Sequence, residues 1–306
     1  MHRRAFAKTF LGGGLSLVFA NNSVAVTPAS DELEQHELFL NGDTRLARRA
    51  LLLIPKHALP REPLPLLILL HGLGETDSEL HGIHAWEDRY GLVQAYQRLR
   101  RAPIIRTLPE AGYLTDQHLE ELNCSLRRQP FQGMMLACPV TPNPHRPGPA
   151  AKTLDRYAEW IESALIPAVK RRRAVREGPR GRGSYGLDGC SMGGYVALEV
   201  FLRKPELFCT LGGVQAAISV PSARDYAGRI ASAIRRVGPR PIQIVTSSGD
   251  PYRRSNQALS TKLRQLGVPN AFSAPPGPHN QPWLREIGTL EMLLWHDRQF
   301  VELAGR

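Results

Sequence analysis

Cysteine is scarce in this chain, and the spacing of the few that occur excludes some kinds of site. The 306 residues include four cysteines, and no two of them have the Cys-x-x-Cys spacing of zinc or thioredoxin-like sites. We therefore predict no metal site. Cys124 and Cys138 are the pair to examine for a disulfide, because an oxidising compartment would permit one, but free buried thiols fit the sequence equally well.

The sequence also lacks an apolar run long enough to cross a membrane. Residues 9–20 supply about 12 modestly apolar positions, whereas a spanning helix needs about 20. Arg3 and Arg4 precede this run, and small residues follow it at 23–25. Residues 1–25 therefore resemble a twin-arginine export signal, and we predict a periplasmic or secreted protein without stable membrane insertion. A disordered basic tail on a cytoplasmic protein is the alternative.

Acidic residues are outnumbered, with 28 Asp and Glu against 39 Lys and Arg, so that the formal net charge is +11. Such a charge attracts polyanions when it gathers on one face. The arginines are spread along the sequence, and the one dense run, at 170–182, has the glycines of a solvated connecting loop. Because no nucleic-acid-binding motif accompanies the charge, we predict no nucleic-acid partner.

After residue 25, short apolar runs alternate with longer amphipathic stretches. This pattern is typical of a mostly parallel sheet that helices cover on both faces, and we predict one α/β domain over residues 26–306. Helices are expected at 154–169 and 285–303, where apolar residues recur at helical spacing. The expected strands are 50–54, 64–70, 134–138, 185–187, 211–218 and 242–245, with a short extended stretch at 271–273.

One connection between predicted strands is unusually long. Residues 75–132 fill it, whereas most such loops have about two to six residues. Leu92, Tyr96 and Leu99 indicate a helix within it, and prolines divide the rest. Because ligands bind at the carboxyl edge of such sheets, we expect a lid-like insertion above that edge that selects the substrate. An interaction surface is the alternative.

Ser191 is the candidate nucleophile, in the sequence Gly-Cys-Ser-Met-Gly at positions 189–193. An apolar strand pattern runs into this motif and a helix pattern runs out of it. A serine on such a sharp turn projects its hydroxyl above the sheet, and Gly189 and Gly193 permit the close approach of strand and helix. A structural serine at a tight turn is the alternative. Cys190 directly precedes Ser191, and its side chain is expected to pack away from the pocket.

A serine nucleophile needs a base, and in this arrangement the chain order is serine, acid, histidine. Two histidines follow Ser191, and His279 lies in a proline-rich loop whereas His296 lies within a helix pattern. We therefore predict His279 as the base. Asp250 follows a predicted strand directly, so we predict it as the acid that orients the imidazole, although an aspartate that only forms a turn is the alternative.

Acyl transfer also needs donors for the developing oxyanion. We expect one from the backbone of Met192, at the helix start, and the other from the turn at 71–74 after the strand 64–70, at Leu73. In that turn, His71 is expected to support the loop together with Gly72 and Gly74, rather than to act as a base.

Residues 67–74, the motif at 189–194, the Ser-Gly-Asp turn that ends at Asp250 and the loop histidine His279 together resemble the esterase D-like family of the α/β-hydrolase superfamily. The resemblance covers most of the chain after residue 25. It implies the α/β-hydrolase fold, and this chain departs from the family in its long insertion after the third strand. It also implies hydrolysis of carboxylic esters through a Ser-Asp-His triad and an acyl-enzyme. No metal or organic cofactor is implied, and the expected partner is a small-molecule or carbohydrate-linked ester.

Three other functions fit the same residues. A peptidase or amidase would use the same triad but usually carries a further recognition domain, for which this chain has little room. An acyltransferase acting on envelope sugars would pass the acyl group to a sugar alcohol instead of water. A noncatalytic binding protein on a hydrolase scaffold is the alternative from another class, because a fold does not by itself imply an activity.

Overall fold

The structure of the chain is a computed structural model that describes residues 31–40, 46–144, 146, 150–178 and 183–305. The predicted export signal at 1–25 lies outside these residues. Within the described parts, no helix is both long enough and apolar enough to cross a membrane.

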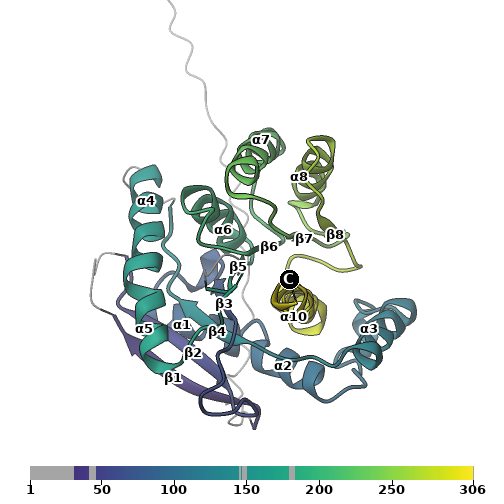
Figure 1. Ribbon diagram of the computed structural model, residues 1–306. Coiled ribbons are helices and arrows are strands. Elements are labelled where there is room, and N and C mark those ends of the chain that lie inside the picture. Colours follow the sequence, from purple (N-terminus) through teal and green to yellow (C-terminus); the bar gives the residue numbers. More distant parts are fainter. Residues whose placement is uncertain (1–30, 41–45, 145, 147–149, 179–182, 306) are drawn as a thin grey trace, which may run out of the picture.

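A single sheet of eight strands forms the centre of the domain (Figure 1). The strand order is β1-β2-β4-β3-β5-β6-β7-β8; β2 runs antiparallel to β1 and to β4, and the strands from β4 to β8 are parallel. This is the mostly parallel sheet that the sequence predicts. The strands are β1 Leu33–Phe39, β2 Arg49–Pro55, β3 Leu66–Leu70, β4 Met135–Pro139, β5 Tyr185–Gly189, β6 Thr210–Val214, β7 Ile242–Val245 and β8 Ala271–Ser273.

Helices cover both faces of the sheet, as predicted (Figure 1). On one face α4, α6, α7 and α8 contact one another in turn, and on the other α1 contacts α2, which packs on α10. The helices are α1 Glu79–Asp88, α2 Leu92–Arg100, α3 Asp116–Arg128, α4 Ala150–Trp160, α5 Ile166–Arg172, α6 Met192–Arg203, α7 Val220–Val237, α8 Arg253–Gln265, α9 Gln281–Trp283 and α10 Thr289–Ala304. Single π-helical turns at Ile161–Leu165 and Leu284–Gly288 join α4 to α5 and α9 to α10.

The centre of the sheet is a continuous apolar core. All five residues of β3 are buried, and so are all five of β4, because each strand has helices on both of its faces. This explains why both strands are uninterrupted apolar runs in the sequence. Strand β6 is shorter than predicted: it ends at Val214, because Gln215 has a left-handed backbone with φ 50°.

The long insertion contains three helices, and the first two of them belong to the helical layers. Helix α1 packs on β2 and β4, and α2 packs on α10, which differs from the expectation of a lid above the sheet edge. The part around Tyr113 reaches the loop that carries His279: a methyl group at Gly277 would lie 3.0 Å from Cδ1 of Tyr113. A lid role for this part remains a prediction.

Candidate active site

Ser191 occupies the sharp turn between β5 and α6. Its backbone, with φ 55° and ψ −119°, lies outside the regions that residues other than glycine usually adopt. Two hydrogen bonds of 2.9 Å hold it there: Ser191 N–H donates to the Val214 carbonyl, and the Ser191 carbonyl accepts from Ala217 N–H. The turn therefore raises the serine hydroxyl at the carboxyl edge of the sheet.

Gly189 and Gly193 are the residues that let this turn close. A Cβ atom at Gly193 would lie 2.1 Å from the carbonyl oxygen of Leu70, and one at Gly189 would lie 2.4 Å from the carbonyl carbon of Gly193. Real Cβ atoms essentially never approach other atoms so closely. The two glycines are thus required by space, as the motif predicts.

The structure brings Ser191, His279 and Asp250 into one hydrogen-bonded chain. Ser191 Oγ lies 3.1 Å from His279 Nε2, and His279 Nδ1 lies 2.9 Å from Asp250 Oδ1. A carboxylate only accepts hydrogen bonds, so Nδ1 of His279 carries the proton and Nε2 of the neutral ring is free to accept the serine proton. The three side chains are arranged for nucleophilic catalysis by the hydroxyl.

Asp250 is completely buried and its carboxylate is fully engaged. Besides the His279 ring, it accepts hydrogen bonds from Thr246 Oγ1 at 2.6 Å and from the Tyr252 backbone N–H at 3.0 Å. The Tyr252 ring meets the His279 ring edge to face, with centroids 5.6 Å apart. These contacts fix the carboxylate and leave His279, with 27% of its side chain exposed, as the solvent-accessible part of the pair.

Gln215 is a residue of the site that the sequence analysis did not identify. It is buried, its backbone N–H donates to the Val245 carbonyl at 2.6 Å, and its Nε2 donates to Ser247 Oγ at 2.8 Å and to the Pro278 carbonyl at 3.2 Å. Gln215 thereby ties the end of β6 to the end of β7 and to the residue before His279. Its left-handed backbone has no signal in the sequence, because glutamine is not a typical turn residue.

The two backbone N–H groups that are predicted to hold the oxyanion each begin a helical turn. Leu73 begins the short 3-10 turn Leu73–Glu75 after β3, and Met192 begins α6. Within the described parts of the chain, neither N–H has a hydrogen-bond acceptor. Free N–H groups at the first turn of a helix are suited to hold a developing negative charge.

His71 holds the loop that carries Leu73. Its ring is completely buried; Nδ1 donates to the Gly72 carbonyl at 2.8 Å, and Nε2 accepts from the Thr141 N–H at 2.8 Å. Burial lowers the pKa of His71 to about 4, so the ring is neutral near pH 7. These contacts are those of a supporting residue.

Tyr90 completes the support of this loop. Its hydroxyl accepts from the Gly72 N–H at 3.1 Å and donates to the buried carboxylate of Glu75, whose pKa is raised by burial. A Cβ atom at Gly72 would lie 3.1 Å from this hydroxyl, whereas one at Gly74 would meet nothing within 4 Å. Gly72 is therefore constrained by its neighbours, and Gly74 is not.

The cysteines take no part in the hydrogen-bonded chain at Ser191. All four are free thiols, so Cys124 and Cys138 are not joined. Cys190 is buried, and burial raises the pKa of its thiol. Among the described residues, no group of three or more His, Cys, Asp and Glu side chains is placed to hold a metal ion.

No protein-family model matches the sequence, and no curated protein matches it either. Solved structures do match. A ferulic acid esterase has a TM-score of 0.60 at 16% identity, over 88% of this chain and 99% of its own. An S-formylglutathione hydrolase from Staphylococcus aureus has a TM-score of 0.56 at 13% identity, over 89% of this chain and 100% of its own. The chain has the α/β-hydrolase fold.

A third similar structure is a feruloyl esterase module from Clostridium thermocellum in complex with sinapinate. Its TM-score is 0.56 at 14% identity, over 88% of this chain and 89% of its own. At such identities the similarity shows the fold, and any activity of this chain depends on the residues around Ser191.

Proposed function

We propose that this chain is a serine hydrolase that cleaves carboxylic esters through an acyl-enzyme. The observation that carries the proposal is the chain of hydrogen bonds from Ser191 Oγ through the His279 ring to Asp250, on a backbone turn that raises the serine hydroxyl. The esterases among the similar structures support ester hydrolysis over other reactions. Membership of the esterase D-like family is part of the proposal.

The reaction has two halves. In the first, His279 Nε2 takes the proton of Ser191 Oγ as this oxygen attacks the ester carbonyl carbon, and the same proton then passes to the departing alcohol. In the second half, water loses a proton to His279 as it attacks the acyl-enzyme, and Ser191 recovers a proton as the acid leaves. The buried Asp250 carboxylate stabilises the imidazolium that forms in each half.

The negative oxygen of each tetrahedral intermediate is assigned to the N–H groups of Leu73 and Met192. Loss of one such donor typically costs about 100-fold to 1000-fold in turnover. The Leu73 side chain is half exposed beside this position, so it is a candidate to contact the acyl group.

The proposed substrate is a small-molecule or carbohydrate-linked ester, and no metal or organic cofactor enters the mechanism. The proposed location is periplasmic or secreted, and it depends on residues 1–25 acting as an export signal. Fusion of residues 1–25 to a reporter enzyme and fractionation of the cells would test this part: a reporter that stays in the cytoplasm contradicts it.

The test of the activity uses the full chain, Ser191→Ala and His279→Ala with a series of 4-nitrophenyl acyl esters. We expect hydrolysis by the full chain and a loss of about 1000-fold or more in kcat/KM for each variant. Covalent labelling of Ser191 by a fluorophosphonate, read by mass spectrometry, checks the nucleophile without a substrate. A folded chain that neither reacts with the probe nor hydrolyses any ester contradicts the proposal and favours a binding protein.

The same experiment separates hydrolysis from acyl transfer. With a sugar alcohol present, a hydrolase releases mainly the free acid, whereas an acyltransferase forms mainly the sugar ester. Product analysis by mass spectrometry therefore decides between the two, and an excess of the sugar ester contradicts the hydrolase proposal.

A further inference from the structure

Helices α7 and α8 together carry a concentrated positive charge. They contain eight basic residues and one acidic residue, Asp225, and so account for a formal charge of +7 out of the +11 of the whole chain. We call these basic side chains the α7–α8 surface; seven of them are exposed and Lys262 is half-buried. They are Arg224, Arg229, Arg235, Arg236, Arg253, Arg254, Lys262 and Arg264.

The two helices lie side by side and lead away from the active site. Strands β6, β7 and β8 are parallel and α7 packs along α8, so both helices begin at the sheet edge that carries Ser191 and Asp250. Arg253 and Arg254 follow Asp250 by three and four residues. Helix α7 has 18 residues and is therefore about 27 Å long. The α7–α8 surface thus runs from the active-site edge to the opposite edge of the sheet.

Most of this charge is not neutralised by neighbours. Arg229 pairs with Glu199 and Asp225, at 3.4 and 3.5 Å. None of the other seven basic residues forms an ion pair with any residue that the structure describes; Arg235 and Arg253 donate hydrogen bonds to Ser232 Oγ and to the Ser248 carbonyl. Isolated like charges repel one another, so this arrangement destabilises the free protein slightly and is relieved by a bound anion.

Helix stability does not explain the two arginines nearest the active site. Cations stabilise the C-terminal end of a helix and destabilise its N-terminal end, because of the helix dipole. Arg235 and Arg236 lie in the last turn of α7, where they are favourable. Arg253 and Arg254 occupy the first turn of α8, which has no acidic residue and no side-chain cap. Their position is unfavourable for the helix and favourable for an anion near Asp250.

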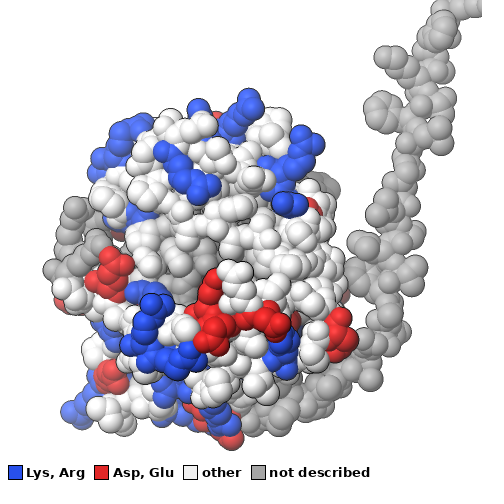
Figure 2. Space-filling view, turned by 90° about the vertical axis from the view of Figure 1, so that its right-hand side faces the viewer, with Lys and Arg blue, Asp and Glu red and all other residues white. Residues whose placement is uncertain are grey.

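The surface has the shape and composition to receive an extended anionic chain. Figure 2 shows Lys and Arg side chains over the top of the molecule, where α7 and α8 lie, with little acidic surface between them. An open groove follows α7, and its charged lining residues are Arg224, Arg229, Arg235 and Arg236 with the single carboxylate of Asp225. Between Val220 and Leu266, the exposed large apolar residues are these two alone: Val220 begins α7, and Leu266 directly follows α8.

We propose that the α7–α8 surface binds an anionic polysaccharide and that the polysaccharide carries the ester that Ser191 cleaves. This inference rests on the proposed esterase function and names its substrate class. A lipid surface is disfavoured because the exposed large apolar side chains are confined to the start of α7, at Val220, and the end of α8, at Leu266. A nucleic acid is disfavoured because Tyr226, the aromatic residue of α7, is buried and cannot stack on bases.

The test compares two variants of equal charge. The surface variant replaces four unpaired arginines by glutamine, and the control variant replaces four exposed arginines elsewhere by glutamine; each lowers the formal charge from +11 to +7. The surface variant is Arg224→Gln, Arg236→Gln, Arg254→Gln and Arg264→Gln. The control variant is Arg61→Gln, Arg128→Gln, Arg171→Gln and Arg172→Gln.

Partly acetylated polygalacturonate is the anionic substrate, and acetylated xylan is the neutral one. At about 20 mM salt, we expect the surface variant to raise KM for the polygalacturonate about tenfold at unchanged kcat, and the control variant to change it less than about twofold. At about 300 mM salt the difference between the variants should nearly vanish. The parent, the surface variant and the control variant should hydrolyse 4-nitrophenyl acetate with the same kinetic constants, and likewise acetylated xylan.

Equal KM values for the two variants on polygalacturonate overturn the proposal. Binding is also measured without turnover, by sedimentation of Ser191→Ala with insoluble polygalacturonate, with and without the four surface substitutions. This assay does not depend on esterase activity: binding that the surface substitutions abolish supports the surface even if the proposed reaction fails. Sedimentation with phosphatidylglycerol-containing vesicles but not with polygalacturonate would replace the polysaccharide by a membrane and overturn the proposal.

Discussion

The carboxylate of Asp188 lies 3.0 Å from Nε2 of His296, and both side chains are completely buried. The other ring nitrogen of His296 lies 3.0 Å from Thr210 Oγ1. This second carboxylate, imidazole and hydroxyl group resembles the arrangement at Ser191, but its burial excludes it from contact with a substrate. It joins β5, three residues before Ser191, to β6 and to α10.

Asp188→Asn tests the importance of this buried group. Asp188 Oδ1 accepts the Gly189 N–H at 2.6 Å while Oδ2 accepts from His296, so an asparagine can satisfy only one of the two donors and turns its own N–H groups toward the other. We expect the free energy of unfolding to fall by about 2 kcal/mol, because a buried donor is left unpaired. Urea denaturation followed by fluorescence measures it.

Asp155→Asn is the matched control, because Asp155 is largely exposed and pairs with Arg203 at the surface. We expect this variant to lose less than about 1 kcal/mol. Equal losses in the two variants would show that the Asp188–His296 contact has no special weight. If the contact matters as expected, mutation of His296 should lower the free energy of unfolding much less in the Asp188→Asn background than in the parent, since the two residues share one contact.

The strands that the sequence predicts are those with uninterrupted apolar runs. Strand β1 was missed for the opposite reason: it lies at the edge of the sheet, and only two of its seven residues, Leu33 and Leu38, are buried. The long insertion was recognised by its length alone. Its placement, with α1 and α2 packed into the helical layer, depends on contacts with β2, β4 and α10 that no local pattern encodes.

The residues of the site also divide into those that the local sequence identifies and those whose role depends on distant parts of the chain. Ser191, Asp250 and His279 were identified because chain order and loop position restrict the choice, and the structure places them in contact. Gln215 and Tyr90 were not identified, because their importance arises from neighbours far away in the sequence. The charge of the α7–α8 surface was also missed: its eight residues are spread over positions 224–264 and gather only when the two helices pack side by side.

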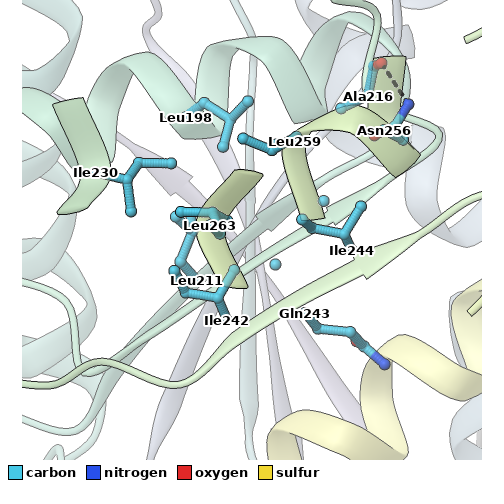
Figure 3. Close-up of a pocket in the computed structure, with 12 residues that line it drawn as sticks. Leu198, Leu211, Ala216, Ile230, Ile242, Gln243, Ile244, Asn256, Leu259 and Leu263 are labelled. Atoms are coloured by element: carbon cyan, nitrogen blue, oxygen red, sulfur yellow. Dashed lines mark hydrogen bonds between the residues drawn. The ribbon is translucent and has the colours of Figure 1, made fainter. Parts of the chain in front are cut away.

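Substitution by alanine is expected to have opposite effects on stability at two adjacent glycines of β6, Gly212 and Gly213. Both line a small cavity of about 10 Å³ between the sheet and helices α7 and α8, shown in Figure 3 with its apolar lining. A Cβ atom at Gly212 would lie 1.7 Å from Asp188 Oδ2, whereas one at Gly213 would lie 3.7 Å from the Ala216 Cβ atom. The first position is closed by the buried carboxylate, and the second is open.

We therefore expect Gly213→Ala to raise the free energy of unfolding by about 0.5 kcal/mol, through a stiffer unfolded chain and added apolar contacts. Gly212→Ala should lower it by about 3 kcal/mol, because the Asp188–His296 contact has to move. Thermal unfolding of both variants decides the matter. Similar destabilisation by both substitutions would mean that the cavity has no room for a methyl group.

His118 makes stability depend on pH. It lies on α3, 2.6 Å from Glu291 of α10, which also accepts a hydrogen bond from Ser273 Oγ at 2.8 Å. The hydrogen bond to Glu291, and more weakly the nearby charges of Glu291 and Glu121, hold the pKa of His118 above its usual value of 6.5. A raised pKa means that the folded state binds the proton more tightly than the unfolded state. This contribution to stability is complete below about pH 6.5 and is lost as the pH rises through the folded pKa.

His118→Gln should therefore lower the free energy of unfolding by about 1 kcal/mol at pH 6 and by much less at pH 9. Denaturant titrations at the two pH values measure the difference. His81→Gln is the control, because His81 pairs with Asp77 on the surface and both side chains are more than half exposed. A loss at His118 that is the same at both pH values would exclude the charged pair with Glu291.

Tyr90 is expected to affect turnover although it lies below the loop of Leu73. Its hydroxyl is the acceptor for the Gly72 N–H, so Tyr90→Phe leaves that buried donor unpaired and frees the loop that positions the Leu73 N–H. We expect kcat for a 4-nitrophenyl ester to fall about tenfold with little change in KM, because the oxyanion forms only after the substrate has bound.

Tyr226→Phe is a close control: that buried hydroxyl also donates to a carboxylate, Glu199, but it joins α6 to α7 away from this loop. Both variants should lose similar stability, and only Tyr90→Phe should lose turnover. If kcat is unchanged in Tyr90→Phe, or falls equally in both variants, the Leu73 N–H does not depend on this support and its assignment to the oxyanion has to be abandoned.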